Sequence, residues 1–142
     1  MIADLQCVVL DCPDPAQLAR FYGALLGGDV DRPDRRWALG DDWATLHTPS
    51  GFVLAFQRVA DHRPPRWPDP ERPQQFHLDF GVADLDRAQE EVLARGATVL
   101  DDGSGAGSAD GSTDGSTDGS GGGQGWRVYA DPAGHPFCLV RH

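Results

Sequence analysis

Alternating apolar and polar residues at 7–12, and again at 76–82, predict two short strands that each bury one face. Each stretch runs into the pattern of an amphipathic helix, with an aspartate, Asp14 or Asp84, at the position of the N-cap. The two strands and the two caps are separated by the same 70 positions. The chain therefore repeats one strand–helix unit.

Three short strands are predicted after each helix, which makes each copy a βαβββ module of an α+β fold. They are expected near 35–39, 43–48 and 52–59 in the first copy, and near 97–101, 126–130 and 136–141 in the second. The predicted organisation is a first module at 1–59, a proline-rich linker at 60–75 and a second module at 76–142, with a flexible Gly/Ser/Asp loop at 103–125.

Composition narrows the class of partner. The 142 residues carry a formal net charge of −10, which disfavours binding to nucleic acid or to an anionic membrane. We find no apolar run of the ~20 residues that a membrane-spanning helix needs. The three cysteines lie in apolar stretches, which favours a reduced, cytoplasmic protein over a disulfide framework. The use of arginine without any lysine is typical of a GC-rich bacterial genome.

Two motifs carry a family resemblance: "ARFYGALLG" in the first helix and "DPAGHPFCLV" at the end of the chain. With the paired modules, they resemble the vicinal oxygen chelate superfamily, and its bacterial glyoxalase-like domain proteins in particular (the glyoxalase, bleomycin resistance and dihydroxybiphenyl dioxygenase fold). The resemblance implies two modules paired around a cavity, and commonly a homodimer. Metal-dependent members place one ligand, usually His or Glu, on the first and last strand of each module. Other members hold an organic ligand without metal.

The resemblance assigns the four ligand positions to Cys7, His77, Cys138 and Ala55, with Gln57 two residues further along the same face. Only the histidine matches the usual set, and both glutamates are missing. We therefore expect no metal or other cofactor. If a metal is bound, Cys7, His77 and Cys138 are its candidate ligands, and zinc or another divalent ion suits two thiolates and an imidazole. The alternative is that both cysteines are small buried apolar residues.

The other candidate site residues are aromatic or polar. His77 and Asp79 are predicted to share one strand face, which makes them the candidates for proton transfer if a reaction occurs. The residues expected to line a small-molecule pocket are Gln57, His77, Asp79, Trp37, Trp43, Trp67 and His47. His135, in the turn before the last strand, receives no role from the resemblance.

These features favour a protein that binds a small organic molecule in the cavity between its two sheets, without the usual metal centre. One alternative is a metal-dependent lyase, isomerase or dioxygenase that uses the unusual Cys/His/Cys set. A third is a resistance protein that sequesters an antibiotic. The sequence leaves open whether any reaction is catalysed.

Overall fold

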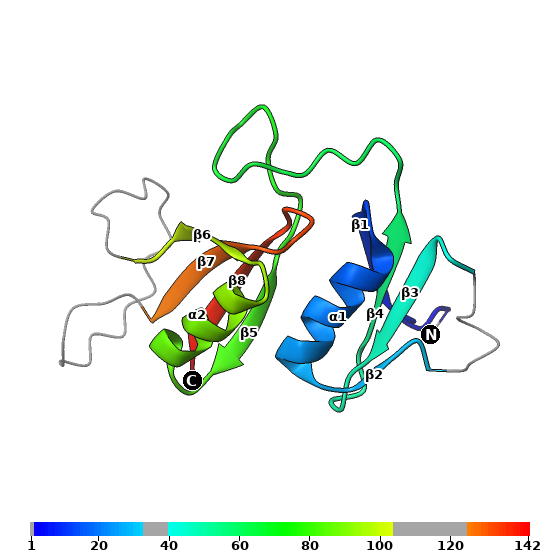
Figure 1. Ribbon diagram of the computed structural model, residues 1–142, viewed down its shortest axis with the longest axis horizontal. Helices are drawn as coiled ribbons and strands as arrows, with labels where there is room; N and C mark the ends of the chain where they lie inside the picture. The colour runs from blue at the N-terminus through cyan, green and yellow to red at the C-terminus, as the bar shows by residue number, and fades with distance from the viewer. Residues whose placement is uncertain (1, 33–39, 104–124) are drawn as a thin grey trace.

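The computed structural model describes residues 2–32, 40–103 and 125–142, which form two modules side by side (Figure 1). The first module contains β1 (Val8–Cys12), α1 (Pro15–Leu26), β2 (Asp29–Val30), β3 (Trp43–His47) and β4 (Val53–Arg58). The second contains β5 (Leu78–Val82), α2 (Leu85–Ala94), β6 (Thr98–Asp101), β7 (Trp126–Ala130) and β8 (Pro136–Arg141).

Each module folds its strands into one four-stranded mixed sheet. The strand orders are β1-β4-β3-β2 and β5-β8-β7-β6. In both sheets the first strand pairs in parallel with the last one, and the other neighbours pair antiparallel. The predicted α+β fold of two βαβββ modules is confirmed.

The repeat is visible in the positions of the elements. β5 and α2 begin 70 residues after β1 and α1, whereas β7 and β8 begin 83 residues after β3 and β4. The additional length falls between β6 and β7, where residues 104–124 of the predicted loop lie outside the described part. The strand predicted near 35–39 also falls outside the described residues. In the described part, the edge strand of the first sheet is Asp29–Val30.

Both helices begin at the predicted aspartate caps. The Asp14 carboxylate accepts a hydrogen bond from the Gln17 amide at 3.0 Å, and Pro15 occupies the first helical position, where its missing N–H is not needed. The Asp84 carboxylate accepts from two amides at the start of α2. These caps satisfy helix N–H groups that have no partner inside the helix, so they fix where each strand ends and each helix begins.

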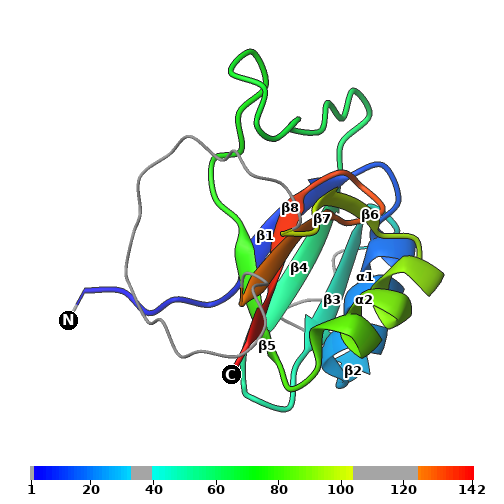
Figure 2. The same ribbon diagram turned by 90° about the vertical axis from the view of Figure 1, so that its left-hand side faces the viewer.

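The two helices lie on the same side of the two sheets (Figure 2). One continuous core joins the modules beneath them. The Phe21 ring of α1 lies 5.9 Å from that of Phe137 in β8, and the Tyr22 ring lies 6.0 Å from that of Phe80 in β5. The face of each sheet that points away from its helix is called its open face below.

The linker crosses from β4 to β5 and rests on the turn that precedes β8. His62 Nε2 lies 2.8 Å from the Ala133 carbonyl oxygen. At Gly134, a Cβ atom would come within 2.4 Å of the Pro64 side chain, so only glycine lets the linker approach this closely. Among the described residues, no helix is long and apolar enough to cross a membrane.

Candidate functional site

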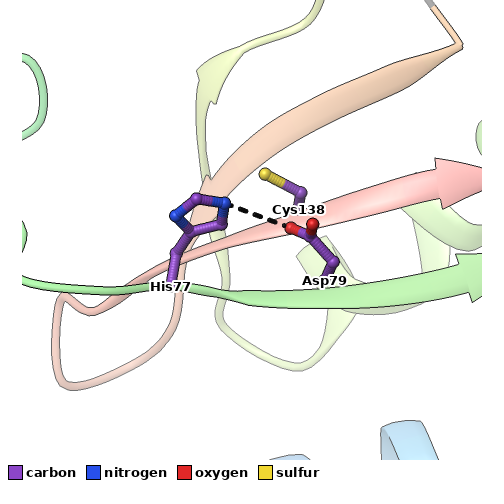
Figure 3. A group of neighbouring side chains, drawn as sticks. All are labelled: His77, Asp79 and Cys138. Carbon is purple, nitrogen blue, oxygen red and sulfur yellow. Dashed lines mark ion pairs between the residues drawn. The ribbon is translucent and has the colours of Figure 1, made fainter.

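The open face of the second sheet gathers three side chains with different donor chemistry (Figure 3). His77 immediately precedes β5 and Asp79 lies within it, so strand alternation turns both side chains away from the core. Cys138 joins them because it is the direct cross-strand partner of Asp79 in the parallel β5–β8 pair. The grouping of His77 with Asp79 follows from the alternation seen in the sequence, whereas Cys138 depends on the register.

The three side chains are close enough to act on one atom. One ligand atom from each of them lies within 4.8 Å of the others, and His77 Nε2 is 3.3 Å from Asp79 Oδ1. Burial, and secondarily the neighbouring Asp79 carboxylate, raises the pKa of Cys138 to about 12. The thiol is therefore protonated near neutral pH when no cation is bound.

A hollow of about 390 Å³ lies over this group, which we call the open-face pocket. Trp67 from the linker and Trp126 from β7 contribute indole rings to its wall. The remaining lining residues are Gln74, His77, Asp79, Val128, Cys138 and Val140. The volume and the mixture of aromatic and polar groups are those of a small-molecule pocket.

A second hollow, of about 480 Å³, lies between β1 and β5, the edge strands through which the two sheets face each other. We call it the inter-module pocket. His77 lines both hollows. The other polar and charged side chains that line it are those of Asp11, Tyr22, Arg63, Glu71, Arg72, Gln75 and His135. Of these two hollows, only the inter-module pocket has lining residues from both sheets, as expected of a cavity between them; the open-face pocket is lined by the second module and the linker.

Several predicted site residues lie elsewhere. Cys7 is not part of the group formed by His77, Asp79 and Cys138, and burial raises its pKa above the ordinary value. The other four, Gln57, Trp43, His47 and Trp37, all belong to the first module.

Three of these four lie on the open face of the first sheet. Trp43 pairs directly with Gln57, and neither residue lines either of the two hollows described above, nor does His47. The Trp43 indole nitrogen and His47 Nε2 are buried without a hydrogen-bond partner among the described residues. Trp37 lies outside the described residues.

A hydrogen-bond network between the modules was not predicted from the sequence. The Asp131 carboxylate is buried and accepts from the Tyr22 hydroxyl at 2.8 Å and from the amides of Ala133 and His135 at 2.8 and 3.0 Å. The His135 ring Nδ1 lies 3.0 Å from the same carboxylate. The turn sequence "DPAGH" contains the signal, but its partner on α1 is 109 positions away and only the fold brings it close.

Two βαβββ modules, with a ligand-sized pocket on an open sheet face, define a protein of the vicinal oxygen chelate class. A family model described as "Glyoxalase-like domain" matches residues 7–140, so the chain belongs to the glyoxalase-like domain family. No curated protein matches the chain.

Solved structures show the same fold along the whole chain. The hypothetical protein SA1046 from S. aureus is 17% identical, with 100% of this chain and 99% of that chain covered and a TM-score of 0.62. A glyoxalase/bleomycin resistance protein/dioxygenase family enzyme from Burkholderia phytofirmans PsJN is 18% identical, with 98% of each chain covered and a TM-score of 0.62. The fosfomycin resistance protein FosX from Listeria monocytogenes is 14% identical, with 100% and 95% covered and a TM-score of 0.60.

At these identities the likeness establishes the fold and leaves the activity open. A mutant form of FosX has been solved as a complex with Mn(II) and 1S,2S-dihydroxypropylphosphonic acid, so this fold holds both a metal and a small organic acid in at least one protein.

Proposed function

We propose that the chain binds a small organic molecule with a planar apolar ring in the open-face pocket, and that this binding needs no metal. The observation that carries the proposal is the pairing of two indole walls, Trp67 and Trp126, with the polar groups of His77 and Asp79 in one hollow of about 390 Å³. A ring in contact with indole faces gains dispersion and apolar burial. The imidazole and carboxylate at the same site supply a hydrogen-bond donor and acceptor that orient the molecule.

The four tryptophans provide the assay, because each indole N–H gives its own signal in a ¹⁵N-edited NMR spectrum. A set of planar aromatic fragments, such as indole, quinoline and catechol, is titrated into the full chain. We expect binding fragments to shift the Trp67 and Trp126 signals in a saturable way. The Trp43 signal, from the open face of the first sheet, should not move.

The matched variants are Trp126→Ala and Trp43→Ala. The first removes a wall of the open-face pocket and should weaken the best fragment at least about fivefold, since burial of an aromatic face is worth more than about 1 kcal/mol. The second should leave its affinity unchanged. Equal losses in both variants, or fragments that shift only Trp43, would contradict the proposal.

An antibiotic is one kind of molecule that this pocket could hold. FosX, a structural neighbour, is a fosfomycin resistance protein. Expression of the chain in a drug-sensitive bacterium, compared with expression of Trp126→Ala, tests a sequestering role. Protection that depends on Trp126 would support this role, whereas equal sensitivity of the two strains to every drug would remove it.

The second candidate function is a metal-dependent reaction, which the grouping of His77, Asp79 and Cys138 favours. One imidazole, one carboxylate and one thiol fit zinc, whose catalytic sites have three protein ligands and an open position. They do not match the oxygen-rich set that manganese prefers. A bound zinc ion would supply Lewis acidity to a substrate oxygen, while the ring of Trp67 would shield that side of the pocket from water.

The metal content of protein purified without a metal-affinity column tests this candidate. The variants Cys138→Ser and Cys7→Ser are matched, because each replaces one partly buried thiol and only Cys138 belongs to the group. Near-stoichiometric zinc that is lost in Cys138→Ser and kept in Cys7→Ser would support a metal enzyme. Metal-free wild-type protein that still binds a fragment would leave the first proposal standing alone.

We also propose that the protein is a cytoplasmic homodimer. Support comes from its three free cysteines and from large apolar side chains, Ile2, Leu5 and Phe52, that are more than half exposed. Analytical ultracentrifugation at micromolar concentration should give twice the chain mass of 15.3 kDa. A single species at the chain mass would refute the dimer.

A further inference from the structure

Charged side chains of both signs line the inter-module pocket, and in the described part of the chain they form no ion pair with one another. Arg63 and Arg72 of the linker line it, as do Asp11 of β1 and Glu71. The side chains of these four residues form no ion pair and no hydrogen bond with any other described residue. Two arginines beside one hollow of about 480 Å³ present the fork geometry that carboxylates bind best.

The same pocket is lined by a histidine whose ring is held in one orientation. The Asp131 carboxylate can only accept, so His135 Nδ1, at 3.0 Å, carries the proton of this bond. With Nδ1 as the donor, Nε2 is the acceptor whenever the ring is neutral, and no described residue donates to it. The buried Tyr22 hydroxyl and the turn amides bind the same carboxylate, which fixes it in place. A buried carboxylate that accepts from one ring nitrogen is a common way for a protein to fix the tautomer and orientation of a histidine.

The acidic side chains limit the kind of ligand. Because Asp11 and Glu71 balance the two arginines, a simple inorganic anion gains little net attraction from the pocket. A ligand that brings a hydrogen-bond donor together with its carboxylate satisfies both kinds of group. The apolar part of such a ligand would lie against the proline rings that also line the pocket, among them Pro64 and Pro65.

We propose that the inter-module pocket is a second binding site, separate from the open-face pocket, for a small organic acid that also carries a hydroxyl or ammonium donor. Arg63 and Arg72 bind the carboxylate of this acid. The donor group faces His135 Nε2, which accepts its hydrogen bond. The site stands on the packing of the linker against the second module and does not depend on what the open-face pocket binds.

Three probes of one shape separate the contributions: phenylalanine carries an ammonium group, 3-phenyllactate a hydroxyl, and 3-phenylpropionate neither. Each is titrated into the full chain and followed through the His135 ring signals and the linker amide signals in NMR spectra. We expect saturable binding of phenylalanine or phenyllactate that shifts His135. The phenylpropionate affinity should be at least about fivefold lower, since one hydrogen bond is lost.

Substitutions at the lining residues test whether the probes bind in the inter-module pocket. Arg63→Met with Arg72→Met should weaken the better probe at least about tenfold. Arg66→Met is the matched control, because Arg66 is a linker arginine that does not line the pocket, and it should change nothing. His135→Gln should erase the preference over phenylpropionate. Far-UV circular dichroism and thermal unfolding verify that each variant is folded.

Three results would overturn the proposal: no saturable shift from any probe up to about 10 mM, equal losses in Arg66→Met and the double variant, or phenylpropionate binding as well as the other two. Trp126→Ala separates this site from the proposed function, because it alters only the open-face pocket. Acid binding that persists in Trp126→Ala while fragment binding is lost shows two independent sites. Loss of acid binding in Trp126→Ala would refute the separate site and leave the open-face pocket as the one binding site.

Discussion

Replacing Tyr22 with phenylalanine removes one oxygen atom from the contact that joins the two modules. The Tyr22 side chain is buried, at 1% exposure, and its hydroxyl donates to the Asp131 carboxylate across 2.8 Å. The pKa of Tyr22 is raised well above its ordinary value, first by burial and then by the Asp131 charge, so the hydroxyl keeps its proton at any pH at which the protein is used. We expect the substitution to destabilise the whole chain, because α1 belongs to one module and Asp131 to the other.

The size of the stability loss depends on which hydrogen bonds the Asp131 carboxylate keeps after the substitution. A hydrogen bond to a charged group contributes about 1.5–3 kcal/mol to stability, and an orphaned buried carboxylate would add more. Asp131 keeps three donors, two turn amides and the His135 ring, so it is not orphaned. We therefore expect a loss of about 2 kcal/mol, which corresponds to roughly 5–10 °C in melting temperature for a chain of this size.

Tyr129→Phe is the matched control, since it makes the same change within one module. The Tyr129 hydroxyl donates to the side-chain oxygen of Gln89 at 2.9 Å and also contacts the Arg127 guanidinium. Arg127 keeps Asp86 and Gln89 as partners after the substitution, so we expect a loss of about 1 kcal/mol, smaller than in Tyr22→Phe. Urea unfolding of both variants, followed by fluorescence and circular dichroism, measures the two losses. A loss in Tyr22→Phe equal to or smaller than that in Tyr129→Phe would refute the reasoning that the inter-module charge–hydroxyl contact is the stronger one.

Three further predictions concern the linker contact and the open-face pocket. Gly134→Ala places a Cβ atom 2.4 Å from the Pro64 side chain at a φ of +93°, and should lower the free energy of unfolding by about 2–4 kcal/mol. The control is Gly40→Ala, which has a φ of +92° in open space and should lower the free energy of unfolding by about 1 kcal/mol. Similar losses in the two variants would show that the linker does not press on the turn. Asp79→Asn removes the charge that disfavours the Cys138 thiolate and should lower its pKa from about 12, as read from thiolate absorbance against pH, and an unchanged pKa would assign the whole shift to burial. Because the folded state holds the Cys138 proton more tightly than the unfolded state, the contribution of Cys138 to the unfolding free energy should be constant below about pH 9.0 and be lost between pH 9.0 and about 12, so the fall in this window should be smaller in Cys138→Ala.

Local patterns predicted the modules because each boundary has its own physical signal. The capping aspartates Asp14 and Asp84 fix the helix starts, and strict alternation identifies β1 and β5. β2 offered no such signal. It has two residues, both exposed, and its assignment rests on pairing with β3, which is a tertiary contact that the sequence of Asp29–Val30 does not specify.

The same distinction, between local sequence signals and tertiary contacts, holds for the residues of the candidate site. His77 and Asp79 were predicted together because they are two residues apart on one strand. Cys7 was grouped with them by family position, but it lies ahead of β1 on the other sheet, and neither alternation nor repeat spacing encodes how two sheets are placed relative to each other. Cys138 reached the group through the β5–β8 register instead.

The repeat pairs each residue of the group formed by His77, Asp79 and Cys138 with a position in the first module. The offset of 70 residues pairs His77 with Cys7 and Asp79 with Val9. The offset of 83 pairs Cys138 with Ala55, which is fully buried.

The first module thus carries two apolar side chains and one thiol where the second has imidazole, carboxylate and thiol. Trp126 keeps an aromatic counterpart in Trp43, so the first copy retains the scaffold and an indole while lacking the polar groups that orient a ligand. We therefore expect one polar open-face site per chain, on the second sheet. A ligand stoichiometry of one per chain in the fragment titration is the direct consequence, and two equivalent sites would show that the first open face also binds.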